Sequence, residues 1–107
     1  QARNRRAWGR LFAEYDAVVA PCWGSTAFPH DDTPFANRQL VVDGEPTFFG
    51  AQVAYPGLAT FPMLPACSVP VGQDGQGLPI GLQVITDFGK DHDAIGFAYL
   101  VNKLMLG

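Results

Sequence analysis

The side chains that could act as nucleophiles in this sequence are few. The only serines are Ser25 and Ser68, and a catalytic serine requires a base within hydrogen-bonding distance and donors for the developing oxyanion. Ser68 lies in an apolar segment between two prolines, without a Gly-x-Ser-x-Gly turn, which favours a buried structural hydroxyl. Cys22 and His30 could form a thiolate–imidazole pair, but a separation of eight residues across a loop does not establish the distance between them. We therefore predict no catalytic residue in this chain.

Two clusters of histidine and aspartate offer oxygen and nitrogen ligands for a metal. Residues 30–32 read His-Asp-Asp and residues 91–93 read Asp-His-Asp. Neither follows the spacing of a known metal-binding loop, so a solvated loop and a helix cap are the expected roles. Gly72, Gly75 and Gly77 lie in a hairpin turn instead of a strand-to-helix junction, which argues against a phosphate site. We predict no metal and no cofactor.

Basic charge is concentrated at the start of the chain. The first ten residues contain four arginines and no acidic residue, whereas residues 11–107 contain all 10 acidic residues of a chain with a net charge of −3. A surface that binds nucleic acid needs a wider basic face, and the acidic remainder would repel a polyanion. We expect no nucleic acid as partner, and a solvated helix face formed by Arg3, Arg5, Arg6 and Arg10.

The composition is typical of a small globular domain outside the membrane. Hydrophobic residues make up 48% and charged residues 16%, which is too apolar for a disordered chain. The longest apolar runs fall short of the roughly 18–20 residues of a membrane helix, and no secretory signal is recognisable. Cys22 and Cys67 are too few for a disulfide framework, so we predict buried free thiols and a cytoplasmic protein.

The elements that must position these residues begin with a helix and a strand. Apolar side chains at helical spacing, from Trp8 to Tyr15, predict a helix over residues 1–15. A strand over residues 16–20 follows and stops at Pro21. Because this strand is apolar throughout, it suits a position covered on both faces of a sheet.

Residues 21–62 form the least regular region of the sequence. Residues 40–45 read as a strand that enters a tight Asp-Gly turn. Residues 47–55 read as the start of a helix that Pro56 and Gly57 interrupt. A connection of this length inside a small domain is often functional.

The last part of the chain carries the strongest local signals. Two strands within residues 65–86 flank a Gly- and Asp-containing turn, which predicts an antiparallel hairpin. A helix over residues 92–105 follows, capped by an aspartate. Helices and strands together predict an α/β class with a mixed sheet and flanking helices, in a single unit that covers residues 1–107.

Two motifs near the end of the chain are more specific than any cluster above. Residues 58–72 read LATFPMLPACSVPVG and residues 77–85 read GLPIGLQVI. This pair resembles the amidase signature family, whose members carry a late LPA..SVP.G segment followed by GLP[IV]G[LV]Q. Residues 15–21, YDAVVAP, are similar to a family strand that ends in proline, and residues 27–31, AFPHD, are similar to a bacterial subgroup of amidases. The resemblance covers nearly the whole chain in the right order.

The resemblance implies that this chain is the C-terminal portion of the amidase signature fold. Family enzymes are several times longer and hydrolyse amides with a serine nucleophile, a second serine in a cis peptide bond and a lysine, all upstream of these motifs. This sequence has only Lys90 and Lys103 and no Gly/Ser-rich segment, so no catalytic residue carries over. We expect a part of a hydrolase that cleaves carbon–nitrogen amide bonds through an acyl-enzyme, inactive by itself.

The resemblance also implies a role for residues 21–62, which in the family help to wall the acyl-binding cleft. A small amide substrate is then the expected ligand of the intact enzyme. The alternative is that aromatic side chains of this region fill the local core. The residues predicted to bind substrate are Trp23, Phe28, Phe48 and Tyr55, and two further aromatic side chains could join them, Phe35 and Phe49.

A different class of function is also compatible with the sequence. The chain could be a free-standing, non-catalytic binding or interaction module. A sheet separated from a larger α/β protein has open edges and uncovered apolar faces. We therefore expect either a homo-oligomer or association with the missing part of the fold.

Overall fold

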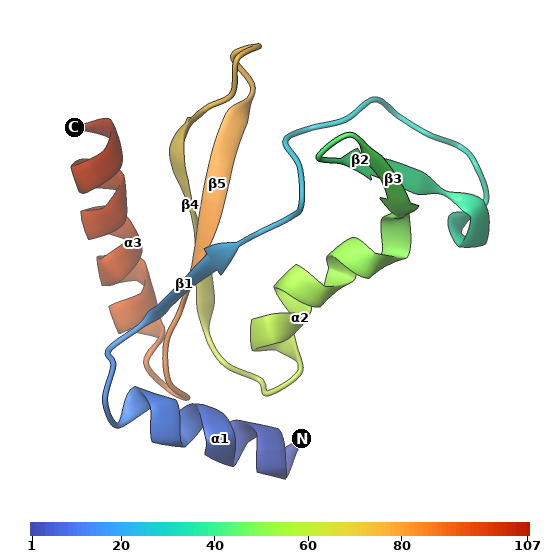
Figure 1. Ribbon diagram of the computed structural model, residues 1–107. Coiled ribbons are helices and arrows are strands. Elements are labelled where there is room, and N and C mark those ends of the chain that lie inside the picture. Colours follow the sequence, from blue (N-terminus) through green and yellow to red (C-terminus); the bar gives the residue numbers. More distant parts are fainter.

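A three-stranded antiparallel sheet forms the centre of the protein in the computed structural model, which describes all 107 residues (Figure 1). Its strand order is β1–β5–β4, and a separate two-stranded sheet pairs β2 with β3. The elements are α1 (Ala2–Phe12), β1 (Val18–Pro21), the short 3₁₀ helix η1 (Phe35–Asn37), β2 (Gln39–Val42), β3 (Glu45–Phe48), the 3₁₀ helix η2 (Phe49–Val53), α2 (Ala54–Thr60), β4 (Ala66–Gln73), β5 (Pro79–Ile85) and α3 (Asp91–Leu106). The predicted α/β class is confirmed, and every observed strand pair is antiparallel.

The hairpin of β4 and β5 has one face covered by α3. Cys67 lies opposite Val84 in the register, and both pack with Val69 against Ala98 of the helix. Because successive side chains of a strand point to opposite faces, Ser68 lies on the other face of the sheet. Its side chain is exposed, so the expectation of a buried hydroxyl is wrong: no helix covers that face at this point.

Strand β1 forms one edge of the sheet and pairs with β5 so that Val18 lies opposite Ile85. Val18 packs with Trp8 and Phe12 of α1 against the fully buried Ile85. Val19, the next residue, is 49% exposed. The expectation that this strand is covered on both faces is therefore wrong, because α1 reaches only one of them.

Residues 21–62 contain more regular structure than expected. Strands β2 and β3 meet at Asp43-Gly44, whose φ angles of 52° and 80° are the left-handed values that a two-residue hairpin turn requires. Residues 47 and 48 belong to β3 instead of a helix. Helix α2 runs through Pro56 and Gly57, because a proline in the first turn removes an N–H that has no partner there.

The two long helices differ from the predicted bounds at their ends. Helix α1 ends at Phe12 and not at residue 15, whereas α3 spans residues 91–106. The expectation that an aspartate caps α3 is wrong, because Lys90 is the cap residue and no side chain caps the helix. Asp91 and Asp93 lie in the first turn, where their negative charge interacts favourably with the helix dipole. Gly107 follows the last turn with a φ of 84°. None of the helices is both long enough and apolar enough to cross a membrane.

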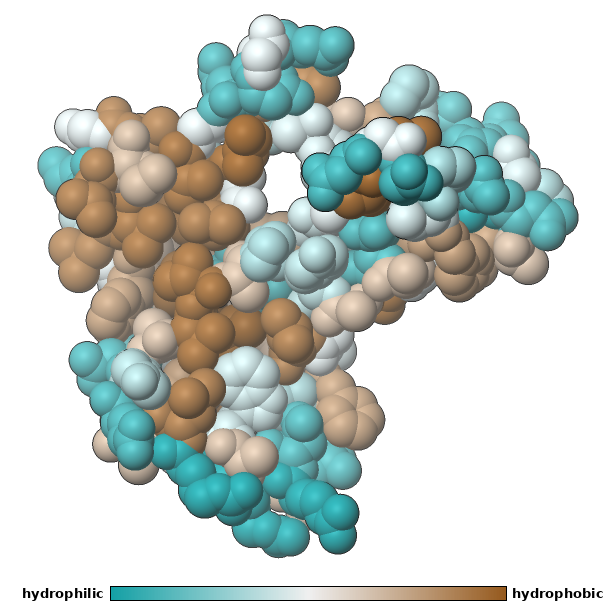
Figure 2. All heavy atoms as spheres, in the orientation of Figure 1, coloured by the Kyte–Doolittle hydropathy of each residue, from teal (hydrophilic) through white to brown (hydrophobic).

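The molecule is open for its size. Its accessible surface is 7375 Å², whereas a compact monomer of 11.5 kDa exposes about 5,800 Å². Its radius of gyration is 15.5 Å, against about 13 Å for a compact domain of this length. Figure 1 shows why: the sheet with α3 forms one lobe, and the β2–β3 hairpin stands away from it as a second lobe. The apolar side chains visible in Figure 2 are therefore covered incompletely.

Candidate functional site

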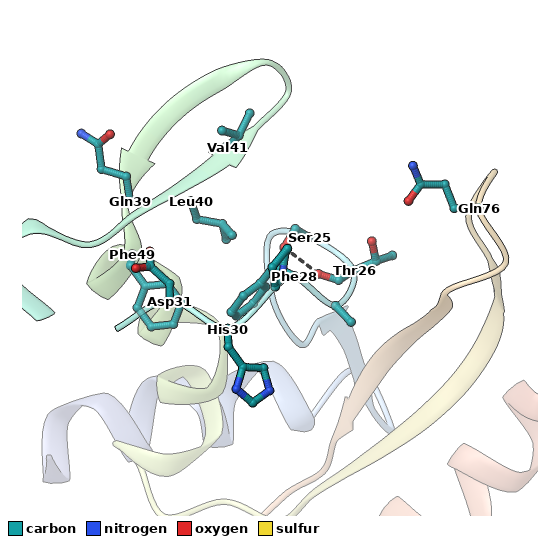
Figure 3. A pocket seen from close by; sticks show the side chains of 12 residues that line it. Ser25, Thr26, Phe28, His30, Asp31, Gln39, Leu40, Val41, Phe49 and Gln76 are labelled. Carbon is teal, nitrogen blue, oxygen red and sulfur yellow. Dashed lines mark hydrogen bonds between the residues drawn. The ribbon is translucent and has the colours of Figure 1, made fainter. Parts of the chain in front are cut away.

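A wide cavity lies where the connection after β1 faces the β2–β3 hairpin (Figure 3). Residues 25–31 form one wall, and residues 39–41 of β2 form the other. The volume is about 730 Å³, which is in the range of small-molecule sites. The lining includes the apolar side chains of Phe28, Leu40, Val41 and Phe49 and the polar side chains of Ser25, Thr26, His30, Asp31, Gln39 and Gln76.

An aromatic cluster holds this wall together. The rings of Phe28 and Phe49 meet edge to face with centroids 5.5 Å apart, and Trp23 packs against them at 6.3 Å and 5.4 Å. The guanidinium carbon of Arg38 lies 5.3 Å from the centroid of Phe49. Each aromatic pair stabilises by about 0.5–1.5 kcal/mol beyond its burial. The rings that face the cavity therefore also pack against one another, although none of them is fully buried.

The structure brings together two of the four residues predicted to bind substrate. Phe28 lines the cavity, and Trp23 stacks behind it. Phe48 does not line the cavity; its ring packs edge-on against Phe35, with centroids 5.6 Å apart. Tyr55 is half-buried at the start of α2 and lies outside the cavity lining.

A carboxylate at the tip of the β4–β5 hairpin holds the wall in place. The Thr26 hydroxyl donates a hydrogen bond to Asp74 Oδ2 over 2.9 Å. Asp74 Oδ1 accepts hydrogen bonds from the backbone N–H groups of Gln76 and Leu78, at 2.8 Å and 2.9 Å. The bonds from Leu78, Thr26 and Gln76 hold the pKa of Asp74 below its ordinary value, because they stabilise the charged carboxylate.

Two further contacts fix the path of the wall behind the cavity. Gln83 of β5 is 6% exposed, and its Nε2 donates to the carbonyl oxygens of Pro21 and Tyr55 at 2.9 Å and 2.8 Å. The segment after β1 also approaches η2 closely, since a Cβ on Gly24 would collide with the side-chain amide of Gln52. The β4–β5 hairpin thus positions two segments that are distant from it in the sequence.

The titratable side chains of the cavity do not form a metal site. Asp31 accepts a hydrogen bond from the Thr33 backbone at 2.9 Å, and hydrogen bonding by Thr33 lowers the pKa of Asp31. The ring of His30 points away from the β2 residues in Figure 3. No three His, Cys, Asp or Glu side chains gather where they could hold a metal ion. The side chains of residues 30–32 are exposed in a loop.

The side chains considered as nucleophiles are engaged elsewhere or stand alone. Ser25 donates its hydroxyl hydrogen to the carbonyl oxygen of Thr26 at 2.9 Å (Figure 3). Cys22 is a free, half-buried thiol beside a second cavity of about 380 Å³, and burial raises its pKa. Lys90 and Lys103 are exposed, and no hydrogen bond links either of them to a serine.

Several residues that line the cavity have no signal in the sequence that would place them there. The pattern predicts a strand from residue 40, yet only the fold directs residues 39–41 toward Phe28. Gln76 lies in the turn of the other hairpin, and no local pattern indicates that it faces the same space. Thr26 carries no signal either, because its partner Asp74 is 48 residues away.

Known proteins resemble nearly the whole chain. The family model described as Amidase matches residues 1–95. The chain is 43% identical to fatty acid amide hydrolase of Medicago truncatula over 94 residues, which are 88% of this chain and 15% of that protein. It is 34% identical to a glutamyl-tRNA(Gln) amidotransferase subunit of Lachnospira eligens over 101 residues, 92% of this chain and 19% of that protein. The chain therefore spans less than a fifth of the length of these curated relatives.

Proposed function

The chain belongs to the amidase family, and from this premise we propose that it is the C-terminal part of a hydrolase that cleaves carbon–nitrogen amide bonds. In the intact enzyme a lysine deprotonates a bridging serine, which activates the nucleophilic serine. The nucleophile attacks the amide carbonyl, the amine leaves with a proton, and water then hydrolyses the acyl ester to release the acid. The residues of this chain contribute a wall of the substrate cleft.

The observation that carries this proposal is the way the two motifs meet in one hairpin. The SVP segment lies in β4, and the GLPIG segment runs from the turn, at Gly77 and Leu78, into the start of β5. Asp74 between them and Gln83 within β5 anchor the wall of the cavity through Thr26 and Pro21. The hairpin that the two motifs form therefore supports a binding surface through hydrogen bonds, without supplying a reacting group.

We assign the substrate-facing role to residues of the cavity wall. Phe28 and Trp23 should pack against an apolar group of the substrate, because their aromatic rings lie at the wall and are only partly buried. Phe48 and Tyr55 complete the proposed wall only if the remaining fold extends it beyond the present cavity. The ligand is a small amide, and we place the intact protein in the cytoplasm, where its free cysteines stay reduced.

Two measurements test this proposal: the coding sequence upstream of Gln1 and an assay of amide hydrolysis. A coding sequence that continues upstream of Gln1 into a Ser/Gly-rich segment preceded by a lysine supports the proposal. The 107-residue chain alone should not hydrolyse simple aryl or aliphatic amides, and turnover above a buffer blank would contradict its assignment as a non-catalytic part. The intact polypeptide should hydrolyse at least one of these amides, and Phe28→Ala should raise its KM.

The second candidate is a free-standing interaction module, and the exposed apolar side chains favour it. Leu104 is 84% exposed and Val41 is 63% exposed, which is unusual for a monomer with no partner. Such a module would self-associate. A start codon close to Gln1, together with a stable oligomer in sedimentation, would favour this candidate over the hydrolase part.

A further inference from the structure

Helix α3 covers the sheet with one face and carries apolar side chains on the other. Ala94, Ala98 and Val101 face the sheet and are buried or packed against it. The outer side chains are exposed by 53–84%, and they are Ile95, Tyr99, Leu100, Leu104 and Leu106. Figure 2 shows this apolar surface gathered over the region that α3 occupies in Figure 1.

The sequence of α3 is that of an internal helix. After Asp93 the only side chains with strong polarity are Asn102 and Lys103. A helix at a protein surface has one apolar stripe and a polar face, whereas a helix that is apolar on all sides is buried. The outer face of α3 therefore requires a cover that these 107 residues do not provide.

The sheet edges, by contrast, are already protected against a further strand. Strand β1 has four residues and ends at Pro21. Strand β4 carries Pro70 and an irregularity between Pro70 and Gly72, and both features discourage edge pairing. Asn102 of α3 also donates a hydrogen bond to the Pro70 carbonyl oxygen at 3.1 Å. The cover that the molecule lacks is a layer over α3 and not an added strand.

The exposed surface is large enough for such a cover, and a part of the excess belongs to the β2–β3 lobe, which stands away from the sheet. The molecule exposes about 1,600 Å² more than a compact monomer of its mass. Each partner of a standard protein–protein interface buries about 800 Å². The relatives are more than five times as long as the matched segment. The family match also stops at residue 95, so it does not describe most of the outer face.

We propose that the outer face of α3 packs against the remainder of the amidase polypeptide, so that α3 is an inner helix between the sheet and a further layer. This proposal rests on the proposed function, because it takes the occupant from the longer hydrolase. The occupant presents apolar side chains to Tyr99, Leu100 and Leu104. Lys103 lies between these residues with its ammonium group 5.8 Å from the Tyr99 ring centroid.

The experiment measures the reactivity of a thiol placed on the outer face. Leu104→Cys is introduced with Cys22→Ala and Cys67→Ala, both into the 107-residue chain and into the polypeptide of the complete reading frame. Glu14→Cys, at an exposed turn residue after α1 that lies outside the cavity lining, is the matched control. Burial that raises the thiol pKa by one unit slows alkylation about tenfold, and steric cover slows it further. We expect at least this protection at Leu104→Cys in the complete polypeptide and none in the shorter chain.

A second variant provides a readout that does not depend on thiol chemistry. Leu100→Lys exchanges two good helix formers, so helix propensity stays nearly constant. We expect the melting temperature of the complete polypeptide to fall by roughly 5 °C or more, because a lysine enters an apolar contact. In the 107-residue chain the same variant should melt at an unchanged or higher temperature.

The outcomes separate this proposal from the one on which it depends. A complete polypeptide that hydrolyses amides while Leu104→Cys reacts as fast as Glu14→Cys overturns only the α3 proposal. Protection that appears only at concentrations where the polypeptide dimerises also overturns it, in favour of a second copy as the occupant. A reading frame with no residues beyond these 107 overturns the proposed function and the α3 proposal together.

Discussion

The β4–β5 hairpin pairs eight residues with seven, whereas the β2–β3 hairpin pairs four with four. Val69, Val84 and Ile85 of the long hairpin are buried, and α3 covers one of its faces. Leu40 is the only buried residue of the short hairpin. The long hairpin is therefore held by a core, and the short one by its turn and by the aromatic cluster beside it.

This difference explains how the two sides of the cavity are stabilised. One side is anchored to the long hairpin through Asp74 and Gln83. The other side belongs to the short hairpin, which no helix covers. Its Phe48 packs against Phe35, and Phe49, which follows the hairpin in η2, packs against Trp23. We expect the side formed by β2 to open at a lower free energy than the side anchored to β5.

The largest loss of stability is expected when a buried side chain is removed from the long hairpin. Ile85→Ala should reduce the free energy of unfolding by about 2–5 kcal/mol, because Ile85 is fully buried. Val41→Ala in the short hairpin is the matched control and should change it by less than about 0.5 kcal/mol, since Val41 is 63% exposed. Urea titration of both variants measures the free energy of unfolding. Equal losses in the two variants would refute the idea that a buried core stabilises the long hairpin but not the short one.

The next largest loss of stability is expected from a substitution in the turn of the short hairpin. Gly44 has a φ of 80°, so Gly44→Ala should cost about 1–2 kcal/mol through strain of the left-handed conformation. Hydrogen exchange should show faster opening of β2 and β3 with β4 and β5 unchanged. Gly75→Ala, at an open position in the other turn, is the control and should have little effect. Faster exchange in β4 would show that the two hairpins unfold as one unit.

The Asp74 anchor gives a smaller effect that depends on pH. The folded pKa of Asp74 is lowered from 3.8, so its contribution is present above the unfolded pKa and is lost as the pH falls below about 4 through the folded value. Asp74→Asn should destabilise the protein at neutral pH and flatten the acid limb of its stability curve. Asp16→Asn, at an exposed carboxyl group between α1 and β1, is the control and should change the stability at neutral pH by less than about 0.5 kcal/mol. Thermal melts from pH 2 to pH 7 decide between these outcomes.

The junction between the two lobes should give the smallest change, in the stabilising direction. Met63 precedes β4 with a φ of 61°, which costs a residue with a Cβ about 1–2 kcal/mol. Met63→Gly removes this strain but costs about 0.5–1 kcal/mol, because glycine has more chain entropy in the unfolded state, so a gain of between zero and about 1.5 kcal/mol is expected. Thr60→Gly at the end of α2 should instead destabilise by about 1 kcal/mol. A loss of stability in Met63→Gly would mean that its side chain makes contacts that outweigh the strain.

The sequence alone predicts those parts of the fold that are determined by local interactions. The Asp-Gly turn at residues 43–44 and the strands on both sides of Asp74 follow from turn chemistry and apolar alternation. The expectation for the apolar strand before Pro21 fails, because an edge strand and an internal strand look alike when few residues are available. Phe49 and Phe48 are adjacent aromatic residues, yet only the first lines the cavity. Which of two neighbours faces a site depends on the turn from β3 into η2, and no pattern in the sequence specifies it.

The pairing of Val18 with Ile85 joins segments that are far apart along the chain. Closing a loop of this length costs conformational entropy before any contact between the two strands compensates for it. We therefore expect β4, β5 and α3, whose contacts are local, to assemble early. During synthesis β1 emerges from the ribosome well before β5, so this strand and the apolar side of α1 must wait for their partner. We therefore expect β1 to join the sheet after the β4–β5 hairpin has formed, so that its apolar side chains stay uncovered in the interval.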